Sequence, residues 1–512
     1  MSGKLLKSTF TVGGMTAVSR VFGLIRDIVI VRLFGAGAEV DAFIVAFRIP
    51  NFLRRLFAEG GFSQAFVPVL AEYKEQRDDV AVKDLVDQTS ATLGLVLLLV
   101  TMAGVLAAPL LIMVFAWGWG IDDAKHVMAS DMLKITFPYI LFVSLTAFAG
   151  SILNTYKQFA VPAFTPVLLN LSLIACAIWL APRMEVPITA LAWGVLIAGV
   201  AQLLFQFPFL IRLKLFPRPG FNKDKEGVNR ILRLMLPTLF AVSIVQINLL
   251  VDTIFASFLA DGSISWLYYS DRMVEFPLGV FGIALATVLL PNLSSEHAKN
   301  ATGKFSSMLD WALRWVFMIG IPAAVGLAVL AVPVLTTLFQ YDEFTPYATI
   351  MSGRSLLAYS LGLPAFILIK VFASGFFSRQ DTKTPVKIAV CAMLANIVLN
   401  LLLIGPLAHA GLALATSLSA ILQALILFWC LRKEAVYIPA SGWLKFTLQI
   451  IVAVAAMAFL IFYYTAPPEQ WFAWDMMQRV LALSLWIGAA ACCYFTVLWI
   501  SGVRWHDMTT QH

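Results

Sequence analysis

Long apolar segments recur along the whole chain, and they limit its fold more than any other feature of the sequence. Each contains about 18 or more mostly apolar residues, enough for a helix to cross a hydrocarbon core of about 30 Å. The chain has 512 residues, of which 60% are hydrophobic and only 13% charged, whereas a soluble domain carries roughly a quarter charged residues. No polar stretch is long enough to form a separate soluble domain. The sequence therefore predicts an all-α integral membrane protein.

The apolar segments predict about 14 transmembrane helices joined by short connections. We expect these helices to begin near Thr9, Val40, Asp84, His126, Val161, Val186, Val228, Ser263, Phe305, Pro346, Pro385, Ala410, Trp443 and Met477. Short connections make consecutive helices antiparallel, so alternate loops should lie on opposite sides of the membrane.

The basic residues of the loops indicate the orientation of the chain. Nearly all of them lie in one alternate set of loops and at the two termini, while the opposite loops contain only Lys125 and Arg183. This asymmetry predicts that both termini are cytoplasmic. The same loop residues account for the net charge of +7, so the charge does not indicate a nucleic-acid partner.

An internal repeat divides the apolar segments into two halves. Matching residues occur in order at nearly equal spacing: Asp27 and Asp252, Pro68 and Pro291, Pro162 and Pro385, and Gln202 and Gln423. Halves with an even number of helices share one orientation and are related by an axis along the membrane normal. We therefore predict an N-terminal lobe of six helices (residues 1–225), a C-terminal lobe of six (226–435), and two further helices with a short tail (436–512).

Arg20 lies deep inside the first predicted helix. It is about eleven residues from the helix start, or about 16 Å at a rise of 1.5 Å per residue. An arginine at this depth costs roughly 2.5–3.5 kcal/mol on insertion scales, so it should face the bundle interior or a water-filled cavity. Asp27 lies on nearly the same face, and Arg26 is about 120° away from Arg20. Arg20 and Arg26 are therefore expected to flank a cavity.

The second predicted helix carries a charged stripe. Asp41, Arg48 and Arg55 recur every seven residues and would share one face of a continuous helix. Pro50 is expected to interrupt this helix, because proline lacks an N–H donor and clashes with the preceding turn. A broken helix at membrane depth is tolerated only where it is buried in protein or lines a cavity. The other charged candidates of this segment are Arg54 and Glu59.

The eighth predicted helix carries a second charged group, formed by Asp271, Arg272 and Glu275. The nearby aromatic residues Trp266, Tyr268 and Tyr269 are expected to form an interfacial belt. Two further charged candidates inside helices are Asp252 and Lys370. Arg32, Arg233 and Arg479 lie near predicted helix ends, and we expect them to reach the headgroups instead.

The intramembrane charges have two interpretations. In the first, acids and bases pair with each other and only fasten helices together. In the second, the surplus of arginine lines a water-filled cavity that binds phosphate, because the planar guanidinium group donates two parallel hydrogen bonds to an oxyanion. A transporter of simple cations would instead need an acidic cavity.

The sequence contains none of the motifs that would indicate an enzyme. It has no Walker loop, no His-Glu-x-x-His pair and no nucleophile elbow, and its five cysteines show no metal-ligand spacing. We therefore expect a transporter without cofactor or metal. Its energy would come from the substrate gradient, a monovalent ion or the membrane potential.

Four segments resemble the MurJ (MviN) family of the multidrug/oligosaccharidyl-lipid/polysaccharide exporter superfamily. They are residues 20–27 (RVFGLIRD), 50–68 (PNFLRRLFAEGGFSQAFVP), 268–277 (YYSDRMVEFP) and 377–385 (FSRQDTKTP). The resemblance covers the whole chain. It implies flipping of lipid II, the undecaprenyl-pyrophosphate-linked peptidoglycan precursor, across the bacterial cytoplasmic (inner) membrane, with the substrate and membrane lipids as partners of a monomer.

The resemblance also implies an architecture and a site. Two six-helix lobes would surround a cationic cavity, and the two C-terminal helices would form a groove for the lipid tail. The implied pyrophosphate-binding residues are Arg20, Arg26, Arg54 and Arg272. The implied charge partners or gate residues are Asp27, Asp41, Arg55, Glu59, Asp271 and Glu275, with Arg48, Lys370 and Asp252 as further candidates.

Three other functions remain open from the sequence. The chain could flip another lipid-linked oligosaccharide, exchange drugs for cations as other members of the superfamily do, or act as a scaffold for wall-synthesis enzymes. The specific segment at residues 50–68 favours lipid II flipping over the other transport functions. Replacement of Arg20 or Arg26 by alanine should abolish flipping but leave a scaffold intact.

Overall fold

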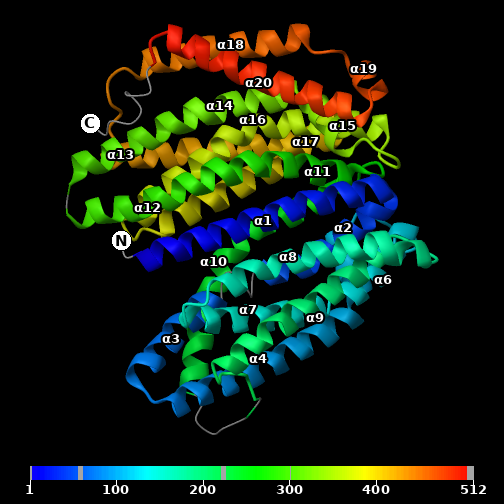
Figure 1. The fold of residues 1–512 in the computed structure, drawn as a ribbon, viewed down its shortest axis with the longest axis vertical. Helices are drawn as coiled ribbons and strands as arrows, with labels where there is room; N and C mark the ends of the chain where they lie inside the picture. Colours follow the sequence, from blue (N-terminus) through cyan, green and yellow to red (C-terminus); the bar gives the residue numbers. More distant parts are fainter. Residues whose placement is uncertain (1–2, 56–61, 219, 221–225, 300, 504–512) are drawn as a thin grey trace. The chain divides into compact units, whose positions relative to one another are not determined.

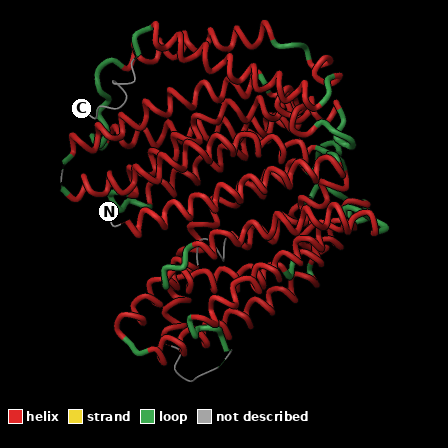
Figure 2. Tube along the Cα trace, viewed as in Figure 1, coloured by secondary structure: helices red, strands yellow, loops and turns green. Residues whose placement is uncertain are grey.

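The computed structural model describes residues 3–55, 62–218, 220, 226–299 and 301–503, and every regular element in these ranges is a helix (Figures 1 and 2). The predicted all-α membrane fold is therefore confirmed. Within these ranges, ten helical segments are long and apolar enough to cross a membrane. The number of 14 crossings stays a prediction, because length and composition alone do not count crossings.

Helix α17 (Lys383–Lys433) contains two of the predicted helices in one segment. Its 51 residues are roughly twice the length that one crossing needs. The helix breaks at Ala408, whose φ of 49° and ψ of −130° are not helical. A Cβ added to Gly411 would clash with the carbonyl oxygen of Leu403, so the chain on the two sides of the break approaches closely. The break lies beside the predicted helix start at Ala410.

The chain forms two compact units, residues 1–262 and 263–512. The helices of the first unit are α1 (Gly3–Phe34), α2 (Ala38–Arg54), α3 (Phe62–Gln76), α4 (Asp79–Leu106), α5 (Ala108–Phe115), α6 (Ala124–Thr136), α7 (Tyr139–Thr155), α8 (Ala160–Ala175), α9 (Thr189–Arg212) and α10 (Glu226–Ala256). Helix α8 packs against both α1 and α9, and α9 packs against α7. A buried core that includes Phe62, Phe66 and Phe148 joins α3 to α7.

Helix α10 packs in the first unit, against α3, α4 and α5. Both guanidinium Nη atoms of Arg230 bond the carboxylate oxygens of Glu72 at 2.8 Å. Just beyond the other end of α10, the Ser257 hydroxyl accepts a hydrogen bond of 2.8 Å from the Gly118 amide. The lobe boundary predicted at residues 225 and 226 follows from the sequence repeat and stays a prediction. In the packing, the helix after this boundary belongs to the first unit.

The second unit is built around a central helix, α16. Its helices are α11 (Ser263–Pro277), α12 (Ile283–Ala298), α13 (Thr302–Trp315), α14 (Ile321–Val329), α15 (Ala331–Phe339), α16 (Pro346–Phe377), α17, α18 (Trp443–Tyr464), α19 (Pro468–Ala473) and α20 (Met476–Ile500). Small residues let α16 and α17 approach closely, as is common between membrane helices. A Cβ on Gly362 would lie 2.9 Å from the Cα of Ser417, whose hydroxyl donates to the Ala358 carbonyl oxygen at 2.7 Å.

The predicted interfacial belt on α11 is wrong for two of its three members. Trp266 and Tyr269 are buried. The Tyr269 ring contacts the rings of Phe339 and Phe344, so packing inside the second unit replaces contact with headgroups. Sequence cannot distinguish these environments, because an amphipathic aromatic ring suits both.

The predicted break at Pro50 is also wrong. Helix α2 continues through Pro50 to Arg54. Proline leaves the carbonyl oxygen of Ala46, four residues earlier, without its helical N–H donor. The Thr136 hydroxyl of α6 lies 3.3 Å from this oxygen and 3.4 Å from the Leu133 carbonyl oxygen, so it can share its proton with both. A neighbouring helix thus replaces the missing donor, as is observed for prolines in membrane helices.

Replacement of Thr136 by valine should destabilise the protein by about 1 kcal/mol, because the buried Ala46 carbonyl oxygen would lose its donor. The same replacement should have a smaller effect in a Pro50→Ala background, where the alanine N–H restores the helical bond. Thermal unfolding in detergent measures both effects. Thr146→Val is the matched control, since that hydroxyl bonds the Phe142 carbonyl oxygen within its own helix. Equal losses in the parent and in the Pro50→Ala background would contradict this explanation.

Candidate functional site

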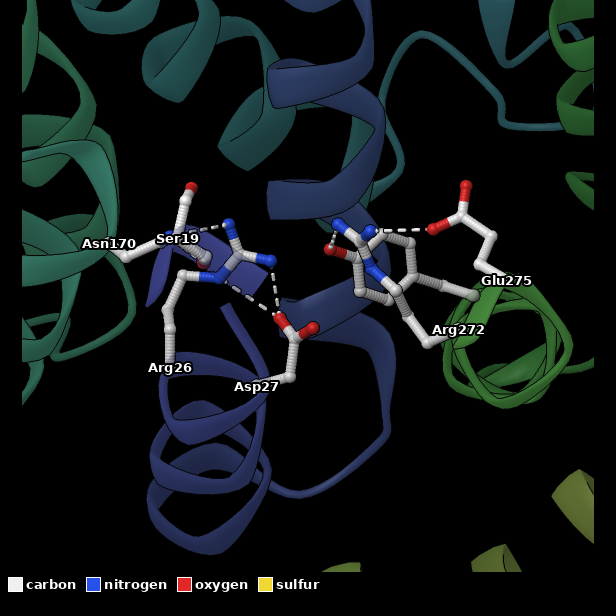
Figure 3. A network of polar contacts seen from close by, with 7 residues as sticks. Ser19, Arg26, Asp27, Asn170, Arg272 and Glu275 are labelled. Atoms are coloured by element: carbon white, nitrogen blue, oxygen red, sulfur yellow. Dashed lines mark hydrogen bonds and ion pairs between the residues drawn. The ribbon is translucent and has the colours of Figure 1, made fainter. Parts of the chain in front are cut away.

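The first charged cluster joins α1 to α8 inside the first unit (Figure 3). The Nε and Nη2 atoms of Arg26 bond Asp27 Oδ1 at 2.9 and 2.5 Å. Arg26 Nη1 donates to Asn170 Oδ1 at 3.1 Å, and Asn170 Nδ2 donates to the Ser19 carbonyl oxygen at 3.1 Å. Arg26 is 6% exposed and Asp27 is 4% exposed. The guanidinium group is therefore held by a carboxylate and an amide in a closed polar junction.

Asn170 packs beside Gly23 of α1. A Cβ on Gly23 would lie 3.7 Å from Asn170 Nδ2, which is ordinary contact. Arg20, one turn before Gly23, is exposed. The sequence places Arg20 and Asp27 on one face, but in the structure Asp27 bonds its neighbour Arg26. Adjacent residues do not normally face each other on a helix, and the long arginine side chain bridges the difference.

The second cluster joins α2 to the end of α10 and to the residues that follow it. The buried Asp41 carboxylate accepts a hydrogen bond of 2.7 Å from the Gly262 amide. Arg48, seven residues later, donates from Nη1 to Thr253 Oγ1 at 2.5 Å. The seven-residue spacing therefore does place Asp41 and Arg48 where both reach the segment 253–262. This segment is the last part of the first unit.

The remaining candidates of the first unit lie near these contacts. Arg54 donates from Nε to Asn51 Oδ1 at 3.0 Å on its own helix. Arg55 and Asp252 are half-buried. Glu59 lies outside the described residues. The candidates that the structure describes in this unit are five arginines and three aspartates, and binding of phosphate by the arginines stays a prediction.

The charged cluster of the second unit lies on one helix, α11. Arg272 donates from Nη1 to Glu275 Oε2 at 2.8 Å (Figure 3). Its Nη2 donates to the Tyr268 hydroxyl at 3.0 Å. The guanidinium carbon also lies 5.2 Å from the centre of the Tyr268 ring. Tyr268, expected in the interfacial belt, thus positions Arg272. Asp271 is half-buried on the same helix, and Lys370 is exposed on α16.

Three residues of these clusters were not identified from the sequence. They are Asn170, Thr253 and Asn51, which bond Arg26, Arg48 and Arg54 respectively. Each is a neutral polar residue inside a membrane helix, where such residues are costly unless they have a partner. That cost could have identified Asn170, which lies in an otherwise apolar segment. No three His, Cys, Asp or Glu side chains in the described ranges are placed to hold a metal ion.

These contacts define what the clusters can do chemically. A buried guanidinium group without a counter-charge would be strongly destabilised, and Asp27 supplies the counter-charge of Arg26 here. An oxyanion of higher charge, such as a phosphate, offers the same planar bidentate acceptor as a carboxylate. The arrangement therefore suits exchange of a protein carboxylate for an anionic ligand.

Comparisons with protein families and with known relatives identify the same family. The family model described as "Lipid II flippase MurJ" matches residues 30–482. The protein of Vibrio cholerae serotype O1 named "Probable lipid II flippase MurJ" is 47% identical over 515 residues, which cover 99% of this chain and 98% of the relative. The Burkholderia cenocepacia protein named "Lipid II flippase MurJ" is 42% identical, with 98% of each chain covered.

Two solved structures have a similar fold. A lipid II flippase MurJ in an inward closed conformation matches with a TM-score of 0.78 and 27% identity, covering 95% of this chain and 99% of that one. An inward-facing multidrug transporter of the MATE family and MOP superfamily matches with a TM-score of 0.70 and 15% identity, covering 81% and 94%. The second match shows similarity of fold alone.

Replacement of Asp27 by alanine should destabilise the protein by roughly 3–5 kcal/mol, because it leaves the buried Arg26 charge without its carboxylate. The double variant Arg26→Met with Asp27→Leu removes both charges and should lose much less. Thermal unfolding of the purified variants in detergent gives the comparison. A double variant no more stable than Asp27→Ala would show that the ion pair is not what Asp27 contributes.

Proposed function

This chain belongs to the lipid II flippase MurJ family, and we propose that it flips lipid II from the cytoplasmic to the periplasmic leaflet by alternating access. It is a multi-pass membrane transporter. The observation that carries the proposal is the set of arginines inside apolar helices of the first unit. Their chemistry fits the diphosphate that links the sugar of lipid II to its undecaprenyl tail.

We propose that Arg20, Arg26 and Arg54 bind this diphosphate. In the structure Arg26 is paired with Asp27, and in the proposed mechanism the incoming diphosphate takes the place of this carboxylate. Arg26 therefore has a negatively charged partner before and after the exchange. Arg272 is the cation predicted from the second unit, and its contact with Glu275 allows the same exchange there.

The membrane location and energy source follow as further parts of the proposal. The basic loops favour an inner-membrane protein with both termini in the cytoplasm, acting as a monomer. No cofactor or metal takes part in the proposed cycle. One charge moved across 100 mV is worth about 2.3 kcal/mol. An inside-negative potential would therefore favour return of the empty, net-positive site toward the cytoplasm.

Other transport functions receive less support. Flipping of another lipid-linked oligosaccharide would use the same diphosphate chemistry, but the relatives over the full length of the chain carry the lipid II name. The similarity to a multidrug transporter concerns the fold alone, and folds of this kind do not determine the substrate. Loss of a drug exporter would only sensitise cells to drugs, whereas loss of this protein should block wall synthesis and lyse growing cells.

Replacement of Arg20 by alanine should lower the rate of lipid II flipping roughly 10- to 100-fold, the effect of losing one or two charge-assisted hydrogen bonds. Fluorescent lipid II in reconstituted vesicles, with quenching of the outer leaflet, measures the rate. Arg233→Ala is the matched control, because Arg233 is exposed on α10 and has no predicted contact with substrate. Equal rates for the two variants would contradict the proposed role of Arg20.

A potential imposed on the same vesicles should change the flipping rate. We expect a negative potential on the side of the cytoplasmic loops to accelerate multiple turnovers several-fold, because it favours return of the empty site. Valinomycin with a potassium gradient sets the potential, and equal potassium on both sides is the control. A rate independent of the imposed potential would remove this part of the proposal without affecting the choice of substrate.

A further inference from the structure

The last two long helices, α18 and α20, form a hairpin with the short helix α19 between them. Within the second unit the hairpin packs against α14 and α15. The apolar part of this contact includes Met318 of the second unit and Ile450, Met457 and Tyr494 of the hairpin. Lipid tails are as apolar as these side chains, so membrane helices are held together by close packing and by interhelical hydrogen bonds rather than by the hydrophobic effect. The hydrogen bonds are directional, so they show where the hairpin is attached.

The first polar contact lies at the start of α18, around the buried carboxylate of Asp310 on α13. Asp310 Oδ1 accepts hydrogen bonds from the Tyr437 hydroxyl at 2.8 Å, from the Trp443 indole at 2.6 Å and from the Ala440 amide at 3.1 Å. Its other oxygen pairs with Arg314 Nε at 2.9 Å. The segment that leads into α18 is therefore wrapped around one carboxylate of the second unit.

The second contact lies in the latter half of α20. The buried Tyr494 hydroxyl donates to the Met318 carbonyl oxygen at 2.7 Å. Met318 lies in a π-helical segment, Val316–Gly320, between α13 and α14. The tyrosine hydroxyl therefore joins α20 to a distorted turn of the helix that it packs against. Loss of the contact would remove a buried interhelical hydrogen bond inside the membrane, where no water replaces the donor.

The third contact lies at the start of α20 and corrects the expectation that Arg479 reaches the headgroups. Arg479 is only 6% exposed. It donates to the carbonyl oxygens of Gln340 at 2.7 Å and Thr336 at 3.3 Å at the end of α15, and to those of Trp471 at 3.1 Å and Phe472 at 2.9 Å in α19. Carbonyl groups at helix C-termini carry partial negative charge. They hold the guanidinium group in place of a carboxylate.

We propose that the hairpin α18–α20 is a fixed part of the second unit and moves with it as one body during transport. The three contacts lie at the start of α18, at the start of α20 and in its latter half, so they fix both position and orientation. A swing of the hairpin would break several buried hydrogen bonds at once. This inference rests on the proposed alternating-access function, because only a transporter that changes conformation gives the hairpin an occasion to move.

Distances between spin labels test the proposal in the full-length chain. One label replaces Leu357 on α16 and one replaces Val452 on α18, both exposed, in a variant whose five native cysteines are replaced. We expect the same distance distribution in lipid nanodiscs with and without lipid II. A shift of about one helical turn, roughly 5 Å, on addition of lipid II would overturn the proposal.

Variants of the contacts provide the second measurement. Tyr494→Phe and Asp310→Ala should each broaden the distribution between residues 357 and 452, because each loosens one attachment. Tyr463→Phe is the matched control, since Tyr463 is exposed on α18. Distributions as narrow as in the parent protein for both variants would contradict the proposed attachment. Flipping of lipid II is measured on the same samples, so failure of the proposed function is recognised separately from a moving hairpin.

Discussion

The structure depends on how positive charge is kept inside an apolar helical bundle. Each buried guanidinium group described above has an oxygen partner at short distance. Arg26 uses a carboxylate and an amide. Arg479 donates to backbone carbonyl groups and lies 5.3 Å from the centre of the Tyr341 ring. The difference matters for function. Carbonyl groups at helix ends cannot leave, so Arg479 fastens helices permanently, whereas a side-chain carboxylate can be displaced by a ligand with more negative charge.

This distinction connects the packing of the first unit to its proposed role. A phosphate-binding cavity that exposed several unpaired arginines would be unstable when empty, because desolvated charge of one sign has no compensation. In the structure the Arg26 guanidinium group donates to Asp27 and to Asn170, and in the proposed function a diphosphate replaces the carboxylate. Under that proposal, the two interpretations that the sequence left open, structural pairing and substrate binding, describe two states of the same residues.

The sequence predicted the helical architecture well, because long apolar segments in a membrane protein have few alternatives. It also identified Arg26, Asp27, Arg272 and Glu275 as charged residues that need partners. It could not identify Asn170 as the partner of Arg26, because spacing along one helix says nothing about which distant helix packs against it. The continuity of α2 could not be predicted for the same reason. The Thr136 hydroxyl that bonds the Ala46 carbonyl oxygen comes from a residue 90 positions further along the chain. The internal repeat likewise gives no indication that α10 packs in the first unit.

The proposed function depends on the binding of the lipid II diphosphate by the intramembrane arginines. Native mass spectrometry of the detergent-purified protein tests it most directly, with lipid II competing against an analogue whose diphosphate is replaced by an uncharged linker of equal length. The account predicts that the protein retains lipid II at least about tenfold better than the analogue and that Arg20→Ala largely removes the preference, as expected for loss of one charge-assisted contact. Equal retention of the two lipids by the unmodified protein would contradict it.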